Sequence, residues 1–430
     1  MRILFITRRF YPDIIGGGEV SAYHIAKSLV DLDNDVFVLT FTEGKFKKEI
    51  IDGIKIYRYP IFYTKIPILS HFLNLEGMYI QMAYRTLKFL DKIKPDVVHL
   101  LNIESIFFTS FILKIKGIPS FATINGPMIS CYVGDCVDYR GNSCIKCSPK
   151  KMFFCIMNKG KTSFIGYFGR FFKFIYGVFH ILELKFFAKK IDKLFPVSKA
   201  IKKLLIENGF NEDKLEVIHN PIPISDKIKT NLKEKLNIQN RRVILYAGRV
   251  TEEKGVHRVV EAMRYIDNAI FLIVGRGSYC RVKTPYYKSL EEMVKKYDLK
   301  EKVKFIGYVE PDNMKEYYSI ADLVVLPCTI YESLSRMLLE ACSYGIPIIA
   351  SNVGGNSEIV EDGKNGILLK TLETEELVKA IKYILENPKI YEEMSKYCKE
   401  KVRKKFSLEI IGGKILDEYK LAIREKIENA

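Results

Sequence analysis

The chain has 430 residues, of which 48% are hydrophobic, and this is enough to build two domains with separate cores. Aromatic residues are plentiful, which argues against a disordered chain, and tryptophan is absent. The formal net charge of +17 predicts an anionic partner. Three classes of partner fit this charge: a nucleic acid, an anionic lipid surface, or a phosphorylated small molecule.

The amino-terminal segment has only a short apolar run before Arg8 and Arg9. A secretory signal places its charges ahead of a longer apolar stretch. The sequence also contains no run of about 20 uncharged apolar residues that would predict a transmembrane helix. We therefore expect a cytoplasmic protein, with contact to the inner face of a membrane as a hypothesis.

Apolar segments alternate with amphipathic segments along the first half of the chain. Strands are expected at residues 1–7, 35–41, 95–101 and 119–124, and helices at residues 20–32, 82–93 and 105–116. The strands are almost continuously apolar, which indicates a parallel sheet that is covered on both faces.

The same alternation begins again in the second half. Strands are expected at residues 241–248, 269–275, 303–309, 322–327 and 366–370, with helices at 255–266, 287–298 and 313–321 between them. Two doubly wound α/β domains follow from this repetition. Residues 1–198 would form the first domain, completed by a terminal helix within 405–430, and residues 199–404 the second.

Ligands of doubly wound sheets bind beyond the carboxyl ends of the strands, and glycines follow several of the expected strands. Gly16, Gly17 and Gly18 precede a helix whose amino-terminal amides could face an anion. Residues 248–255 ("GRVTEEKG") place Arg249 and Lys254 in a loop where two cations could hold a diphosphate. The alternatives are a flexible turn for the glycines and a solvated loop of mixed charge for the cations.

Two glutamates follow the strand that ends near Pro327. Glu332 lies in the loop after this strand, and Glu340 lies inside the next helix, which Ser333 or Ser335 could cap. Helical side chains lean toward the amino terminus, so Glu340 could reach the same region as Glu332. A carboxylate accepts two hydrogen bonds, which suits a vicinal diol. The alternative is a helix carboxylate on the surface.

These motifs together resemble the family-4 retaining glycosyltransferases, which have the GT-B fold. The matching segments include "YPDIIGGGEVSAYHIAKSL", "AGRVTEEKG", "IVGRGS", and the segment from Tyr331 to Leu368, and they span nearly the whole chain in the family's order. The pair Glu332 and Glu340 resembles the family's E-x7-E motif. The resemblance implies two Rossmann-like domains that face a central cleft.

The resemblance also implies roles for individual residues. The donor would be a nucleotide-diphosphate sugar whose diphosphate is held by Arg249 and Lys254, without a metal or other cofactor. Glu332 would bind sugar hydroxyls and Glu340 the ribose. The remaining donor-binding positions would be backbone-rich loops, namely Gly16, Gly17, Gly18, Gly248, Gly275, Arg276, Leu334 and Ser335.

The sequence departs from the family pattern at Leu334–Ser335, where the family often has Phe-Gly, at Asn220–Pro221, where it usually has Asn-Gly, and at Asn125, and the last departure matters most. Asn125 follows the strand at residues 119–124, where the family often has a histidine that contacts the donor sugar. An asparagine donates a hydrogen bond but does not take up a proton. The resemblance implies that the leaving diphosphate accepts the acceptor's proton on the same face of the sugar, so Asn125 is retained as a candidate catalytic residue.

Five of the nine cysteines lie close together in the sequence. Cys131, Cys136, Cys144 and Cys147 follow a C-x4-C-x7-C-x2-C spacing, and Cys155 comes shortly after. Cysteines at such spacings in a cytosolic chain predict a structural zinc site, although no common zinc finger has this pattern. A disulfide pair and unlinked buried thiols are the alternatives.

The segment from Lys150 to Lys203 contains 13 lysines and arginines but only two acids, and its cations alternate with phenylalanines and tyrosines. Arg170 and Lys173 interrupt the apolar run, so the segment is expected to lie on a membrane surface rather than to cross the membrane. Binding of single-stranded nucleic acid is a weaker alternative because no RNA-binding motif accompanies the segment. A second alternative is a helix that packs in the core and has a basic outer side.

The sequence therefore predicts a membrane-associated retaining hexosyltransferase. It would move a sugar from a nucleotide-diphosphate donor to a glycan or a lipid-linked acceptor. The main alternative is a catalytically silent GT-B subunit that binds or scaffolds, which Asn125 motivates. A third possibility is a non-hydrolysing sugar-nucleotide epimerase, which would share the fold. Two glutamates at this spacing are not expected in such an epimerase.

Overall fold

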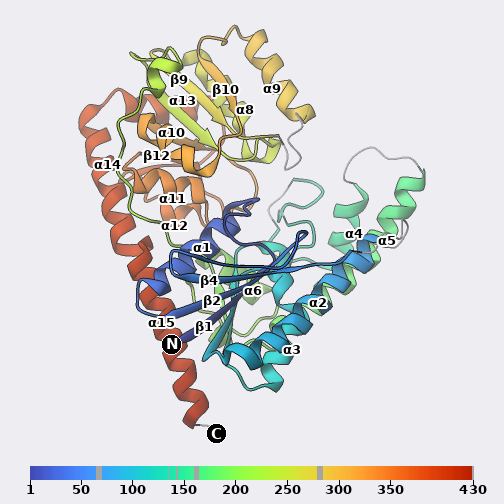
Figure 1. Cartoon of the computed structure of the whole chain (residues 1–430). Helices are drawn as coiled ribbons and strands as arrows, with labels where there is room; N and C mark the ends of the chain where they lie inside the picture. The colour runs from blue at the N-terminus through green and yellow to red at the C-terminus, as the bar shows by residue number, and fades with distance from the viewer. Residues whose placement is uncertain (64–69, 135, 142–143, 159–163, 278–283, 429–430) are drawn as a thin grey trace. The chain divides into compact units, whose positions relative to one another are not determined.

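The chain folds into two compact units, seen in the computed structural model of Figure 1. The first contains Met1–Pro221 and Leu408–Ala430, and the second contains Ile222–Ser407. The structure describes residues 1–63, 70–134, 136–141, 144–158, 164–277 and 284–428.

The first unit is built on a seven-stranded sheet with the order β3-β4-β2-β1-β5-β6-β7. Its strands are β1 (Arg2–Ile6), β2 (Asp35–Thr42), β3 (Lys47–Ile51), β4 (Ile54–Pro60), β5 (Val97–Leu100), β6 (Ser120–Ile124) and β7 (Lys193–Pro196). All neighbouring strands are parallel except β3 and β4, which form an antiparallel edge. In the central pair, Ile3 of β1 lies opposite Val36 of β2.

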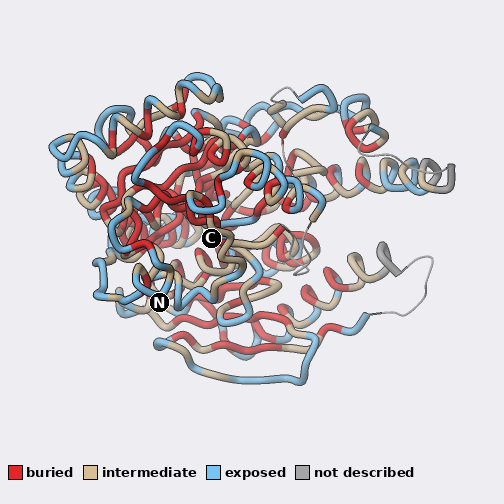
Figure 2. Tube along the Cα trace, turned by 90° about the horizontal axis from the view of Figure 1, so that it is seen from above, coloured by how far each residue is buried: buried red, intermediate tan, exposed pale blue. Residues whose placement is uncertain are grey.

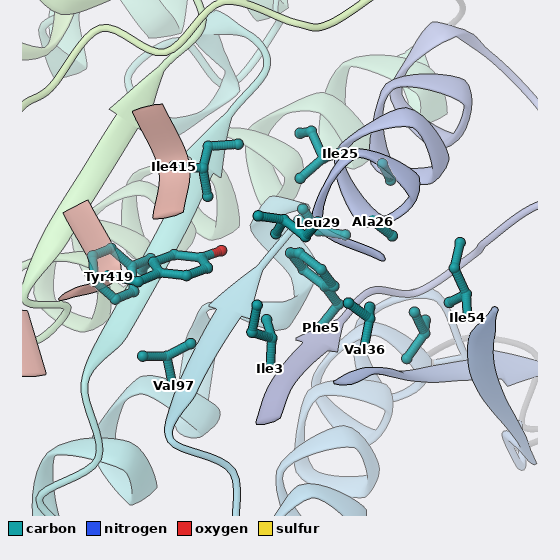
Figure 3. Close-up of a cluster of buried hydrophobic side chains, with 14 of the residues drawn as sticks. Ile3, Phe5, Ile25, Ala26, Leu29, Val36, Ile54, Val97, Ile415 and Tyr419 are labelled. Atoms are coloured by element: carbon teal, nitrogen blue, oxygen red, sulfur yellow. The ribbon is translucent and has the colours of Figure 1, made fainter. Parts of the chain in front are cut away.

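Helices cover both faces of this sheet. They are α1 (Gly17–Val30), α2 (Ser70–Ile93), α3 (Phe107–Ile115), α4 (Pro149–Met157), α5 (Phe164–Ala188), α6 (Lys199–Glu207) and α15 (Leu408–Glu428). One face packs on α1 and on α15, the last helix of the chain, which supplies Ile415 and Tyr419 to the core (Figure 3). On the other face, Tyr57 of β4 contacts Phe89 of α2. The central strands are buried on both faces, as expected for a covered parallel sheet.

A polar contact lies inside this core. His99 of β5 is fully buried, with Nδ1 2.5 Å from the Tyr419 hydroxyl and Nε2 2.8 Å from Thr123 Oγ1. Both ring nitrogens therefore have partners, which a buried imidazole requires. Burial lowers the pKa of His99 to about 3.

The second unit has a six-stranded sheet, and all of its paired strands are parallel. Its order is β10-β9-β8-β11-β12-β13, and the strands are β8 (Arg242–Ala247), β9 (Ala269–Val274), β10 (Val303–Gly307), β11 (Leu323–Leu326), β12 (Ile348–Ser351) and β13 (Gly366–Leu369). The order reverses direction at β8 and β11, which is the position where doubly wound sheets bind ligands. Most strands of both units consist mainly of buried residues, and Figure 2 marks the buried and exposed residues along the trace.

The helices of the second unit are mostly short. They are α7 (Leu232–Lys235), α8 (Val256–Ala262), α9 (Pro285–Lys296), α10 (Met314–Ile320), α11 (Arg336–Ser343), α12 (Asn356–Ile359), α13 (Thr374–Leu385) and α14 (Pro388–Lys401). The sequence pattern predicted two parallel sheets, and the structure has them. It missed β3, β4 and β7: β3 is mostly charged and largely exposed, Lys55 and Arg58 interrupt the apolar residues of β4, and β7 has only four residues.

Candidate active site

The loops after β8, β11 and β12 meet at the carboxyl edge of the second sheet. The loop after β8 contains a 3-10 turn, Glu252–Lys254, and Thr329 of the β11 loop donates its backbone N–H to Glu253 O at 2.9 Å. Gly255 has a φ of +72°, and a Cβ at this position would lie 2.0 Å from Pro327 O. Only glycine fits this contact, so the backbones of the β8 and β11 loops pack directly against each other.

Glu332 is held on two sides. Its backbone carbonyl accepts a hydrogen bond of 2.7 Å from Gly355 N, in the turn that follows β12. Gly354 has a φ of +56°, and a Cβ there would lie 1.9 Å from Glu332 O. The Glu332 carboxylate is bonded to the Lys254 ammonium, and the exposed fractions of the two side chains are only 16% and 14%. The structure therefore brings together Glu332 and Lys254, which lie 78 residues apart in the sequence.

The other predicted cation lies in the same loop. Arg249 is exposed, and its backbone carbonyl accepts a hydrogen bond from the buried Tyr246 hydroxyl. Gly248 N donates to Val274 O at 2.9 Å, and a Cβ on Gly275 would lie 1.8 Å from Gly248 O. The glycine turns after β8 and β9 are thus in direct backbone contact. This contact fixes the loop that carries Arg249.

Arg276, in the turn after β9, makes one backbone contact and one side-chain contact within the second unit. Its backbone carbonyl accepts a hydrogen bond of 2.8 Å from Val250 N, which connects the β9 turn to the β8 loop. Its guanidinium lies 3.6 Å from the centre of the Tyr308 ring. Stacking of this kind orients the planar side chain.

Glu340 lies on α11, where Ser335 is the residue before the first turn and makes no side-chain capping bond. The Glu340 carboxylate accepts hydrogen bonds from the Tyr318 hydroxyl at 2.7 Å and from Arg336 at 3.1 Å. Burial raises the pKa of Tyr318 well above its usual range, so this hydroxyl keeps its proton and remains a donor. Leu334 and Ser335, just before the helix, are both buried.

Sequence reasoning missed Tyr318 and Arg336 as neighbours of Glu340. The i, i+4 spacing from Arg336 to Glu340 is a signal that could have indicated the arginine. Tyr318 comes from α10, and no local pattern connects it with α11. Together these two donors orient a carboxylate that keeps 30% of its side chain exposed.

In the first unit, the predicted residues again lie at the carboxyl ends of strands. Asn125 follows β6, donates to Leu101 O at 3.3 Å, and accepts from Asn220 Nδ2 at 3.2 Å. Asn220 is buried, and among the residues that the structure describes its own Oδ1 has no hydrogen-bond partner. Arg8 lies 3.8 Å from Glu104, and burial raises the pKa of the Glu104 carboxyl. Sequence reasoning had not selected Arg8, Glu104 or Asn220.

The glycine triplet forms the start of α1. Gly16 N donates to Glu19 Oε2 at 2.9 Å, which closes a capping interaction at the first turn. The nearest atom to a Cβ on Gly16 would be this same carboxylate at 3.9 Å, and nothing lies within 4 Å of a Cβ on Gly18. Packing inside the first unit therefore does not require glycine at Gly16 or Gly18.

Five cysteines line one pocket in the first unit: Cys131, Cys136, Cys144, Cys147 and Cys155. Burial, together with three of these neighbouring cysteines, raises the pKa of the Cys147 thiol to about 12. Among the described residues, no group of three or more histidine, cysteine, aspartate or glutamate side chains is arranged to hold a metal ion. The zinc set at Cys131, Cys136, Cys144 and Cys147 therefore stays a prediction.

The fold of both units matches solved structures of glycosyltransferases. A sucrose-phosphate synthase from Thermosynechococcus elongatus aligns with a TM-score of 0.72 over 99% of both chains, at 18% identity. HepE of Anabaena, solved in complex with UDP and glucose, aligns with a TM-score of 0.70 over 97% of this chain and 99% of its own, also at 18% identity. The chain therefore has the GT-B fold, with two α/β domains that are each built on a parallel sheet.

Family models identify the class more closely. The model for "Glycosyltransferase Family 4" matches residues 15–226, and the model for "Glycosyl transferases group 1" matches residues 228–405. The chain belongs to this family of glycosyltransferases.

Relatives of the chain include an uncharacterized glycosyltransferase of Methanocaldococcus jannaschii, which is 26% identical over 98% of this chain and 99% of its own length. An alpha-D-kanosaminyltransferase of Streptomyces kanamyceticus is 28% identical over 45% of this chain and 49% of its own length.

Proposed function

We propose that the chain is a retaining hexosyltransferase that transfers a sugar from a nucleotide-diphosphate donor to a glycan or a lipid-linked acceptor. The ion pair of Lys254 and Glu332 is the observation that carries this proposal. Lys254 would bind phosphate and Glu332 would bind sugar hydroxyls, and the two lie in contact at the sheet edge where doubly wound folds bind ligands. HepE of Anabaena, which shares the fold, has been solved with UDP-glucose.

The diphosphate would bind between the Lys254 ammonium and the Arg249 guanidinium. Both lie in the loop after β8, which backbone contacts with the β9 and β11 loops hold in place. Preorganised cations stabilise the negative charge that develops on a leaving diphosphate, without reorganisation during the reaction. The backbone at Leu334 and Ser335, next to the start of α11, would complete the anion site.

The two glutamates would divide the rest of the donor between them. Glu332 would accept hydrogen bonds from sugar hydroxyls, and Lys254 would then bridge the sugar site and the diphosphate. Glu340, oriented by Tyr318 and Arg336, would accept the ribose hydroxyls. Gly248, Gly275 and Arg276 would line the donor site, and the backbone contacts between their turns would fix its loops.

The first unit would supply the acceptor side. Gly16, Gly17 and Gly18 would allow close approach of the donor, since packing inside this unit does not require glycine at Gly16 or Gly18. Asn125, held by Leu101 O and Asn220, would donate a hydrogen bond to the sugar and would leave proton uptake to the departing diphosphate. The site of action would be the cytoplasmic face of a membrane.

Turnover of nucleotide-diphosphate sugars tests this function. We expect release of nucleoside diphosphate from at least one donor, and loss of most of this release in Lys254→Ala. A chain that binds nucleoside diphosphates but hydrolyses or transfers none of a broad donor panel would instead be the silent GT-B subunit that Asn125 suggests.

A further inference from the structure

An unusual apolar stripe lies on the exposed side of α5. Phe172, Ile175, Phe179, Leu182 and Phe186 are spaced by three and four residues, so they share one side of the helix. Their exposed fractions are 51%, 42%, 72%, 63% and 54%. Single exposed apolar residues are normal, but a continuous row of this kind marks an interaction surface.

The opposite side of α5 is already occupied by the first unit. Ile181, Leu184 and Ala188 are buried there, and a Cβ on Gly177 would lie 3.0 Å from the Tyr132 ring. Phe187 contacts Phe107 and Phe108 of α3. The helix is therefore anchored on one side while it presents a second apolar side outward.

Lysines accompany the exposed stripe. Lys189 and Lys190 follow the end of α5, and the Lys190 ammonium lies 4.7 Å from the centre of the Phe186 ring. Lys173 is exposed between the first two stripe residues. Within the described part of α5, Glu183 is the one acidic residue. Burial and the nearby charge of Glu76 raise the pKa of the Glu183 carboxyl.

We propose that the α5 stripe docks the protein on an anionic lipid surface, with Phe179 and Leu182 in the interfacial region and Lys189 and Lys190 on lipid headgroups. A second copy of the chain is a poorer occupant, because it would bring another net charge of +17 against the same lysines. None of the helices that the structure describes is long and apolar enough to span a bilayer. An interfacial helix with aromatic and basic residues suits attachment to the surface.

This inference deepens the proposed function, since it names the surface from which a lipid-linked acceptor would be reached. Its test does not depend on transfer activity. The full chain is floated with vesicles of phosphatidylcholine alone and of phosphatidylcholine mixed with phosphatidylglycerol. We expect binding to the anionic vesicles, weakened by added salt.

Matched variants distinguish binding through the α5 stripe from binding through any exposed apolar residue. Phe179→Ser with Leu182→Ser is compared with Ile427→Ser and Ile50→Ser, whose residues are exposed by similar fractions of 72% and 65% but lie on α15 and β3. Only the α5 pair should reduce vesicle affinity, by about tenfold or more. Replacing Lys189 and Lys190 with glutamine should reduce it by about fivefold for each lysine.

Three results would overturn the proposal: equal binding to neutral and anionic vesicles, equal losses in the two serine pairs, or no binding at all. Analytical sedimentation of the same proteins tests the alternative, in which a second copy of the chain covers the stripe. A dimer that dissociates in the α5 pair, with no vesicle binding by the parent chain, would assign the stripe to a second copy. Thermal unfolding of each variant confirms that it is folded before its binding is compared.

Discussion

Lys254 and Glu332 form a largely buried ion pair between the loops after β8 and β11, although they are 78 residues apart in the chain. The pair joins the two halves of the proposed donor site. It also means that each residue affects the charge that the other presents to a ligand. The effect of replacing either one therefore depends on whether the ligand carries a diphosphate, a sugar, or both.

Removal of the cations should reduce turnover strongly while the fold survives. Arg249→Ala and Lys254→Ala should each lower kcat by about 10²–10³, the cost usually seen when one preorganised group that stabilises transition-state charge is lost. Lys404→Ala is the control, because this side chain is 77% exposed in the same unit. Steady-state assays on the three variants measure the effect, and similar rates in all three would count against the cation site.

The same mechanism predicts activity in the presence of a chelator. Transfer should persist in EDTA, because side-chain cations replace a metal at the diphosphate. If EDTA abolishes transfer and magnesium or manganese restores it, the side-chain mechanism is wrong. Restoration by zinc alone would instead point to the cysteine pocket.

The glycine turn behind Glu332 offers a test of how the site is held. Gly354→Ala would push a methyl group against Glu332 O, where the Cβ would lie only 1.9 Å away. Gly363→Ala is the matched control, since Gly363 also has a positive φ, +76°, but nothing lies within 4 Å of its Cβ. We expect Gly363→Ala to cost about 1–2 kcal/mol of stability and to spare turnover.

Gly354→Ala should cost more stability than the control and should also lower turnover. Urea unfolding and donor turnover on both variants provide the comparison. Equal effects of the two substitutions would show that the approach of Gly354 to Glu332 does not position the glutamate.

The stability of the first unit should depend on pH through His99. Its pKa is about 3 in the folded chain and about 6.5 when unfolded, so below pH 6.5 the unfolded state binds a proton that the folded state does not. Stability is therefore complete above pH 6.5 and falls by about 1.4 kcal/mol per pH unit below it. Between pH 7 and pH 5 the loss from this residue should be about 2 kcal/mol.

His99→Gln removes the titrating group and should flatten this part of the pH profile. Urea unfolding of the parent chain and the variant at both pH values measures the difference. An equally steep loss of stability in both proteins would mean that His99 is not the source.

The cysteine pocket is tested by metal analysis. Protein purified without a chelator should contain about one zinc per chain if four cysteines bind it. Cys144→Ser with Cys147→Ser should lose this metal, whereas Cys398→Ser, a buried cysteine of the second unit, should keep it. Absence of metal, with every thiol titratable in denaturant, would reject the zinc site.

Local patterns predicted two parallel sheets and the positions of Lys254 and Glu332 in loops that follow strands, because strand hydrophobicity and glycine turns are short-range features. They placed Lys254 and Glu332 at the same sheet edge, since carboxyl ends of parallel strands meet there. They did not predict that the two would pair, nor that Tyr318 would bind Glu340. These contacts depend on how α10, α11 and the loops pack, and no spacing within one segment encodes that packing.

The division of labour between the two glutamates is the central claim, and isothermal titration calorimetry with two ligands tests it most directly. A hydrogen bond to a charged group contributes about 1.5–3 kcal/mol, or roughly 10- to 150-fold in affinity. Glu340→Gln should weaken a nucleoside diphosphate and its nucleotide-sugar by this factor alike. Glu332→Gln should leave nucleoside diphosphate binding intact or tighter, because Lys254 loses its competing partner, while sugar transfer falls. If Glu332→Gln weakens the bare nucleotide as much as Glu340→Gln does, or if neither variant changes affinity or turnover, the account of this site is wrong.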